Sequence, residues 1–217
     1  MGAVYEAEDT LLAKRVALKV LSADLVPVRE HLARFVREAR AAASIGHPSI
    51  VEIYDSGIEG QDLPFFAMEL LQGCSLAAEL RERGRLSVAR SIDIACQSLA
   101  ALGAAHKVGV VHRDLKPDNI FLCFETGSSP TGGALEPCDR IKVLDFGISK
   151  FAGPVAGAEG RPAAAEPSTL TRTGAILGTP QYMSPEQAAG SKSVDHRTDL
   201  YAVGAVLYHM LSGRPPF

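Results

Sequence analysis

The hydrophobic period of this 217-residue chain changes about a third of the way along. Before residue 71, short runs alternate apolar and polar residues, and Lys14–Leu21 places Val16, Leu18 and Val20 on one face of an expected strand. After Gly73, apolar residues recur every three or four positions, as in helices. A strand-rich first third followed by a helix-rich remainder predicts an α+β fold of two lobes, over 1–71 and 72–217.

The turn and capping residues give approximate bounds for these elements. In the first part we expect a helix that opens at Pro27, buries Phe35 and Ala39, and ends before Gly46 and Pro48, with further strands at Ile50–Tyr54 and Leu63–Leu70. In the second part we expect a strand at Ile141–Leu144, a helix from about Asp195 to Leu211, and surface loops at Thr126–Cys138 and Ala152–Ser168.

The longest helix is expected between Ser87 and Gly109. Ser87 is a favourable N-cap and Gly109 a favourable C-terminal residue. The apolar spacing predicts one buried side, consisting of Val88, Ile92, Ala95, Leu99, Leu102 and His106.

Charge and composition exclude several classes of protein. Lys and Arg number 22 against 25 Asp and Glu, a formal net charge of −3, so bulk charge gives no reason to expect nucleic-acid binding. The most apolar stretch, Leu200–Leu211, is too short to span a bilayer, and no signal peptide opens the chain. The four cysteines are far apart, which disfavours a disulfide or zinc framework. We therefore expect a cytoplasmic globular chain, although a fuller gene product could carry a membrane segment.

The most informative motif is His-Arg-Asp-Leu-Lys-Pro-Asp-Asn at 112–119, where Asp114 precedes the amide Asn119 by five residues. Asp145-Phe146-Gly147 follows the expected strand at Ile141–Leu144. Upstream, Lys19 ends a Val-Ala-Leu-Lys strand, and Glu38 lies in a helix 19 residues later. Each pattern alone has an ordinary explanation as an exposed lysine, a solvated acid or a turn, so only their shared order and spacing carry information.

Together these motifs resemble the signature set of protein kinases over essentially the whole chain. The match includes Gly2-Ala3-Val4 as the tail of a glycine-rich loop, the segment 178–186 (Gly-Thr-Pro-Gln-Tyr-Met-Ser-Pro-Glu) and Asp199. The ending Ser-Pro-Glu-Gln looks most like bacterial serine/threonine kinases of the eukaryotic type. The resemblance implies a two-lobed fold, with a small antiparallel-sheet N-lobe over 1–71 and a helical C-lobe over 72–217.

The resemblance also implies an activity: Mg²⁺-dependent transfer of the γ-phosphoryl group of ATP to serine or threonine hydroxyls of protein substrates. Catalysis would come mainly from positioning and charge neutralisation. Lys19, paired with Glu38, would contact the α- and β-phosphates. Asp114 would orient the attacking hydroxyl and accept its proton, and Lys116 would contact the γ-phosphate.

The cofactors would be held by two further groups of residues. Asn119 and Asp145 offer hard oxygen ligands suited to Mg²⁺. ATP would bind against the glycine-loop tail, the lysine strand and the connection between the lobes, at Gly2, Val4, Ala17, Lys19, Met68, Glu69 and Leu71. A plain apolar strand would also explain Met68, as a core residue.

Threonines between Asp145 and Glu186 suggest regulation. A phosphate on Thr171 or Thr173 could pair with Arg113 and order a segment rich in Gly and Ala, so we expect phosphorylation there.

Compared with the family, the chain begins at the last glycine of the phosphate-covering loop and stops at Arg214–Phe217. The first strand and the last helices of the domain are then outside it, as is the arginine that pairs with Glu186 in the family, and we expect low stability for this piece alone. Two alternatives stay open: a pseudokinase-like module that binds nucleotide or a partner, and an inactive fragment. The protein substrate, the activating signal and the oligomeric state are not assigned.

Overall fold

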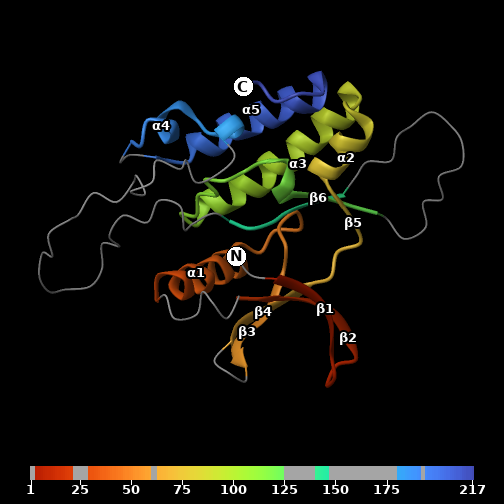
Figure 1. Cartoon of the computed structure of the whole chain (residues 1–217), viewed down its shortest axis with the longest axis vertical. Coiled ribbons are helices and arrows are strands. Elements are labelled where there is room, and N and C mark those ends of the chain that lie inside the picture. The colour runs from red at the N-terminus through yellow and green to blue at the C-terminus, as the bar shows by residue number, and fades with distance from the viewer. Residues whose placement is uncertain (1–2, 22–28, 60–62, 125–139, 147–179, 192–193) are drawn as a thin grey trace, which may run out of the picture.

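The computed structural model describes residues 3–21, 29–59, 63–124, 140–146, 180–191 and 194–217. The described elements divide into a sheet-rich part at one end and a helical part at the other (Figure 1). In chain order they are β1 (Ala3–Asp9), β2 (Lys14–Val20), α1 (Arg29–Ile45), β3 (Ile53–Glu59), β4 (Leu63–Glu69), β5 (Gly73–Ser75), α2 (Leu76–Arg83), α3 (Val88–Lys107), η2 (Pro117–Asn119), β6 (Ile120–Cys123), β7 (Arg140–Val143), η3 (Pro180–Tyr182), α4 (Pro185–Ala188) and α5 (Arg197–Ser212).

The N-terminal sheet is antiparallel, in the order β1-β2-β4-β3. The predicted strand β2 is one of its two inner strands, and Lys19 on it pairs with Val4 on one side and Phe66 on the other. Strand β1 was not predicted. It is joined to β2 by a turn in which the Asp9 carboxylate accepts hydrogen bonds from the backbone N–H groups of Leu11 and Leu12.

The core of this lobe lies between α1 and the sheet. Phe35 and Ala39, four residues apart on α1, are buried with Leu21 and Phe66, as their helical spacing predicts. The Phe35 and Phe66 rings are tilted against each other with centroids 4.9 Å apart. This packing fixes the sheet side that carries Lys19.

The strand predicted at Ile50–Tyr54 is wrong in its first half, because β3 begins only at Ile53. The backbone hydrogen bonds of the preceding segment go instead to β7: Val51 N–H donates to Val143 O (3.2 Å) and Val143 N–H donates to Ser49 O (2.8 Å). Residues 49–51 therefore attach the N-terminal lobe to β7 of the helical lobe through backbone hydrogen bonds.

The helical lobe contains a second antiparallel sheet, in the order β5-β6-β7. Gly73 (φ +151°) begins it, and a Cβ there would lie 1.9 Å from Leu122 O, so the close strand pairing requires glycine. The predicted strand at Ile141–Leu144 is β7, shifted by one residue. Helix α2 and strands β5 and β6 were not predicted, because elements this short contain too few residues for a hydrophobic period to be recognised.

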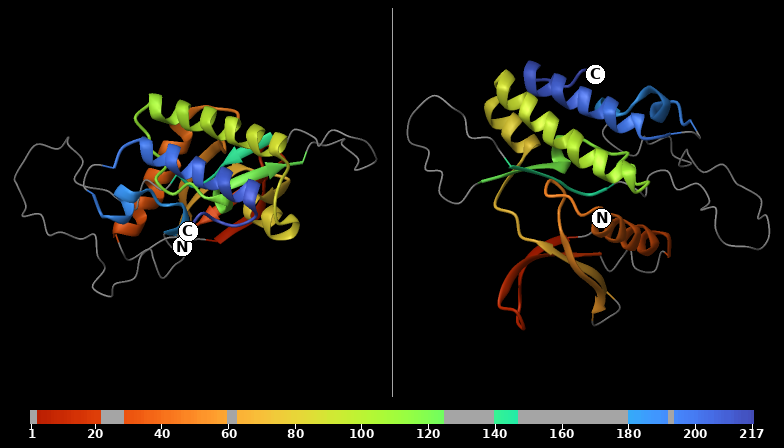
Figure 2. Two further views of the ribbon diagram at one scale, coloured as in Figure 1. Left: turned by 90° about the horizontal axis from the view of Figure 1, so that it is seen from above. Right: turned by 180° about the vertical axis from the view of Figure 1, so that it is seen from behind.

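Helix α3 packs against β7 of this sheet, and α5 runs alongside α3 (Figures 1 and 2). Both match the predicted ranges to within two residues, and the Ser87 hydroxyl accepts from Arg90 N–H as the expected N-cap. The face predicted for α3 is partly wrong, since Val88, Ile92 and Leu99 are exposed. The buried face consists of two large aliphatic residues, Ile94 and Leu102, and of small residues, which are Ser91, Ala95, Ser98, Ala101 and Ala105.

Among the described residues, no helix combines the length and the apolar character needed to cross a membrane.

Candidate active site

A cavity of about 230 Å³ lies where the two lobes meet. Its lining includes five residues expected to surround a base, together with apolar residues of the helical lobe, Phe121 and Leu144. Those five are Val4, Ala17, Met68, Glu69 and Leu71. These five positions, assigned to one site from the sequence, thus line one cavity.

Lys19 and Asp145 meet at the same cavity. The Lys19 Nζ atom lies 2.6 Å from Asp145 Oδ1, although the two residues are 126 positions apart. The Lys19 side chain is largely buried and the Asp145 side chain is half exposed, so the carboxylate faces the open side. Asp145 has φ +48°, a conformation that costs a non-glycine residue roughly 1–3 kcal/mol and is found mainly at functional sites.

Four of the expected residues cannot be compared with the structure. Gly2, Thr171 and Thr173 lie outside the described residues, and so does the side chain of Glu38, whose backbone lies in α1. The expected Lys19–Glu38 ion pair therefore stays a prediction.

The loop that carries Asp114 is held by its own polar groups. Asp114 N–H donates to His112 Nδ1 (3.2 Å), and Asn119 Nδ2 donates to Asp114 O (2.9 Å). The Lys116 Nζ atom lies 3.6 Å from Asp114 Oδ2, and both side chains are about four-fifths buried. The expected acid and its neighbouring lysine thus point to the same place.

Two hydrogen bonds join this loop to the segment of Asp145. Leu144 N–H donates to Asn119 O (2.9 Å), and His112 Nε2 bonds Leu144 O (3.0 Å). Because Leu144 precedes Asp145 directly, these bonds hold the backbone of Asn119 close to that of Asp145, the residue that contacts Lys19.

The protonation state of His112 follows from its partners. Its Nε2 must donate to the Leu144 carbonyl, while Nδ1 must accept from Asp114 N–H, which requires the neutral Nε2–H tautomer. The ring is fully buried and tilted against Phe146, with centroids 4.8 Å apart. Burial lowers the pKa of His112, which keeps the imidazole ring in this neutral form.

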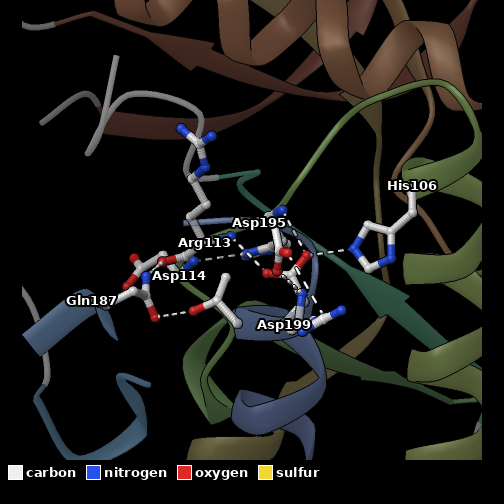
Figure 3. Close-up of polar contacts among 9 residues, drawn as sticks. His106, Arg113, Asp114, Gln187, Asp195 and Asp199 are labelled. Carbon is white, nitrogen blue, oxygen red and sulfur yellow. Dashed lines mark hydrogen bonds and ion pairs between the residues drawn. The ribbon is translucent and has the colours of Figure 1, made fainter. Parts of the chain in front are cut away.

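Asp199 is the buried anchor of the loop (Figure 3). Its carboxylate accepts from the backbone N–H of His112 (2.9 Å) and of Arg113 (2.8 Å), and it contacts His106 Nε2 (2.7 Å). Arg113 has φ +63°, so the aspartate holds the backbone in a conformation that would otherwise be unfavourable. Sequence reasoning noted Asp199 only as a family match and did not find the role of His106; an acid within the apolar pattern of a helix was the available signal.

The segment after residue 180 is fastened to the same loop. Gln187 Nε2 donates to Arg113 O (2.8 Å), and the Thr198 hydroxyl links Gln187 to Ser184. Tyr182 bonds His209 Nδ1 through its hydroxyl (2.7 Å), and burial, with a smaller effect of Asp118, raises the pKa of Tyr182 to about 12. The phenol therefore remains a hydrogen-bond donor at neutral pH.

The donor chemistry at Asn119 and Asp145 fits a hard divalent cation. The Asn119 amide nitrogen is engaged by Asp114 O, which leaves its amide oxygen as the ligand atom. No group of three His, Cys, Asp or Glu gathers in the part of the chain that the structure describes. Two protein oxygens are nevertheless sufficient for Mg²⁺ when substrate phosphates and water complete its shell.

A two-lobed α+β fold with a lysine–aspartate pair and a buried acid–amide loop at the junction defines the protein kinase class. The family model described as protein kinase domain matches residues 1–217, and the chain belongs to this family. Proteins of this family generally use ATP and a divalent metal.

The chain is similar to bacterial serine/threonine-protein kinases. It is 43% identical over 217 residues to pkn3 of Myxococcus xanthus, covering all of this chain and 36% of that protein. It is 38% identical to PknB of Mycobacterium leprae, covering 31% of that protein. The crystal structure of the Mycobacterium tuberculosis PknI kinase domain matches with a TM-score of 0.68 at 30% identity, covering all of this chain and 71% of that one. The chain thus spans about a third of the curated relatives.

Proposed function

We propose that this chain is the catalytic part of a serine/threonine protein kinase, which transfers the γ-phosphoryl group of ATP to a hydroxyl of a protein substrate. The observation that carries the proposal is the Lys19–Asp145 contact at the mouth of an apolar cavity built by both lobes. The apolar lining suits a flat nucleotide base, and the opposite charges of Lys19 and Asp145 suit the metal-bound triphosphate joined to it.

The adenine would lie in the cavity against Val4 and Ala17, with Met68 guarding the back of the pocket. The backbone groups of Glu69 and Leu71 would pair with the base edge. The lining favours this arrangement because it is mostly apolar and, among the described residues, includes only three charged ones, Lys19, Glu69 and Asp145.

Lys19 would bind the α- and β-phosphates, assisted by Glu38, once nucleotide separates it from Asp145. Asp145 and Asn119 would then hold Mg²⁺, which would neutralise charge on the phosphate oxygens. The short Lys19–Asp145 distance supports this assignment, since it keeps the cation and a metal ligand within reach of one triphosphate.

Asp114 would orient the substrate hydroxyl and accept its proton as the oxygen attacks the γ-phosphorus. The bond between that phosphorus and the β–γ bridging oxygen breaks, and ADP leaves. Lys116, 3.6 Å from the Asp114 carboxylate, would balance charge on the γ-phosphoryl oxygens.

The wider assignments belong to the same proposal. We assign the N-lobe to 1–71 and the C-lobe to 72–217, and we expect regulatory phosphorylation at Thr171 or Thr173. The partners would be ATP and protein substrates with serine or threonine, without nucleic acid, in the cytoplasm.

The test is incorporation of labelled phosphate from Mg²⁺-ATP into a generic basic protein, comparing the chain with Asp114→Asn. Label that depends on Asp114 supports the proposal. Nucleotide binding without transfer in the unmodified chain would favour a pseudokinase-like module. A chain that neither binds nucleotide nor folds would favour an inactive fragment.

A further inference from the structure

Lys142 makes a polar contact between the lobes that the proposed chemistry does not use. It lies on β7 in the helical lobe, and its Nζ is 2.5 Å from Glu69 Oε1 at the end of β4 in the N-terminal lobe. The same ammonium donates to Ile50 O (3.3 Å), in the segment 49–51 whose backbone is hydrogen-bonded to β7. One side chain thus joins three parts of the chain.

The contact is largely shielded from water. The side chains of Lys142 and Glu69 are 13% and 18% exposed. Glu69 Oε1 also accepts the backbone N–H of Glu52 (2.8 Å), so the carboxylate is fixed from two directions. A charge pair with this burial and these additional hydrogen bonds restricts geometry far more than an exposed pair does.

The position of Glu69 gives the contact its consequence. Glu69 and the two leucines after it line the base cavity, whereas Lys142 is not among the described residues of that lining. Lys142 lines a neighbouring hollow of about 330 Å³, with Glu52 and His47. It therefore reaches Glu69 from outside the base cavity and affects a bound base indirectly, through the residues that it holds.

We propose that Lys142 is a positioning residue for the nucleotide base. By holding the Glu69 carboxylate, it fixes the backbone of residues 69–71 at the spacing that adenine requires and ties that spacing to the orientation of the two lobes. The inference rests on the proposed function, because it takes residues 69–71 as the segment that pairs with the base.

Lys142→Met keeps most of the side-chain length and removes the charge. The variant removes one of the two contacts that hold the Glu69 carboxylate and leaves the bond from Glu52 N–H. The base-binding backbone is then held less firmly, and affinity for the base falls by about 5- to 10-fold. Adenosine separates this effect from the phosphate end, because it cannot contact Lys19 or a metal at Asp145. Equal loss of affinity for adenosine and for Mg²⁺-ATP is expected, with kcat changed by less than about twofold.

A matched control is available within the helical lobe. Arg90 Nη1 lies 2.5 Å from Glu79 Oε1, and these side chains are 12% and 9% exposed. The burial of this pair and the distance between its charged atoms are therefore similar to those of the Lys142–Glu69 pair. Glu79 lies on α2 and Arg90 on α3, however, and neither residue lines the base cavity. Arg90→Met is expected to lower thermal stability and to leave adenosine affinity unchanged.

The experiment measures Kd for adenosine and Mg²⁺-ATP by calorimetry, with KM, kcat and a thermal melt for each variant. A double variant, Glu69→Gln with Lys142→Met, removes both charges and carries the test if Lys142→Met does not fold; it too is expected to bind adenosine more weakly than the unmodified chain. Unchanged adenosine affinity in a folded variant without Lys142, or an equal loss in Arg90→Met, would overturn the inference. Failure of the unmodified chain to bind either ligand would instead overturn the proposed function beneath it.

Discussion

The two lobes meet at one cavity but hold their functional side chains in different ways. In the helical lobe, the Asp114 loop is anchored to Asp199, which is fully buried, above a core in which Ile94 and Leu102 are also fully buried. In the N-terminal lobe, Lys19 lies on a strand whose neighbour β1 exposes Val4 and Tyr5. The helical lobe therefore supplies a preorganised acid, while the sheet supplies a cation and a base-binding surface beside a smaller core.

This difference assigns separate effects to substitutions in the two lobes. Changes at the reacting atoms should affect turnover without affecting folding, since Asp114 and Lys19 belong to the site. Changes at buried anchors of the helical lobe should affect folding first, because polar groups would lose their partners in a region without water.

The largest effect is expected for Asp114→Asn. The amide has a similar shape but cannot accept the proton, so kcat should fall by about 10³- to 10⁴-fold while ATP affinity changes little. Steady-state phosphate transfer and calorimetry measure the two quantities. Retention of more than a tenth of the activity would contradict the assigned role.

The next effect concerns the anchor itself. Asp199→Ala removes the acceptor for the N–H groups of His112 and Arg113 and for His106, and should lower the free energy of unfolding by about 3 kcal/mol or more. Urea denaturation gives the value, and Lys19→Met in the other lobe is the comparison, expected within about 1 kcal/mol of the unmodified chain. Equal destabilisation by both would remove the contrast between the lobes.

A smaller effect is expected from pH, through His112. Since burial lowers its pKa in the folded state, the unfolded chain binds the proton more readily below pH 6.5. The contribution of His112 to stability is therefore complete above that pH and is lost as pH falls, by at most about 1.4 kcal/mol per pH unit. Urea denaturation between pH 7.5 and 5.5 should show this slope, which His112→Gln should reduce. Stability that rises as the pH falls over this range would contradict the neutral buried ring.

The smallest effect is expected at the exposed edge of the sheet. Arg15 pairs with Glu6 between β1 and β2, and both side chains are more than half exposed. Arg15→Ala should therefore cost less than about 1 kcal/mol, and less still at high salt. A larger loss in urea denaturation would mean that the sheet edge is more tightly coupled to the core than its exposure indicates.

Local patterns predicted much of this organisation. The order of Lys19, 112–119 and 145–147 indicated the fold and the cluster of charged groups, and Ser87 and the helical spacing located α3 and α5. The signals were sufficient because each depends on neighbouring residues or on a motif of fixed spacing.

Long-range packing accounts for what the sequence did not predict. The buried face of α3 is selected by the approach of α5, and residues 49–51 pair with β7 rather than with β4. The contacts of Asp199 with His106 and of Lys142 with Glu69 join positions 93 and 73 residues apart. No periodicity within one element reports such pairings.

The most direct test of the shared site is a crystal structure of the chain with Mg²⁺ and a non-hydrolysable ATP analogue. We expect the base against Ala17 and Met68 of the sheet lobe, the phosphates at Lys19, and the metal on Asn119 and Asp145 of the helical lobe. A nucleotide held by one lobe alone, or a metal bound away from Asn119 and Asp145, would contradict the account.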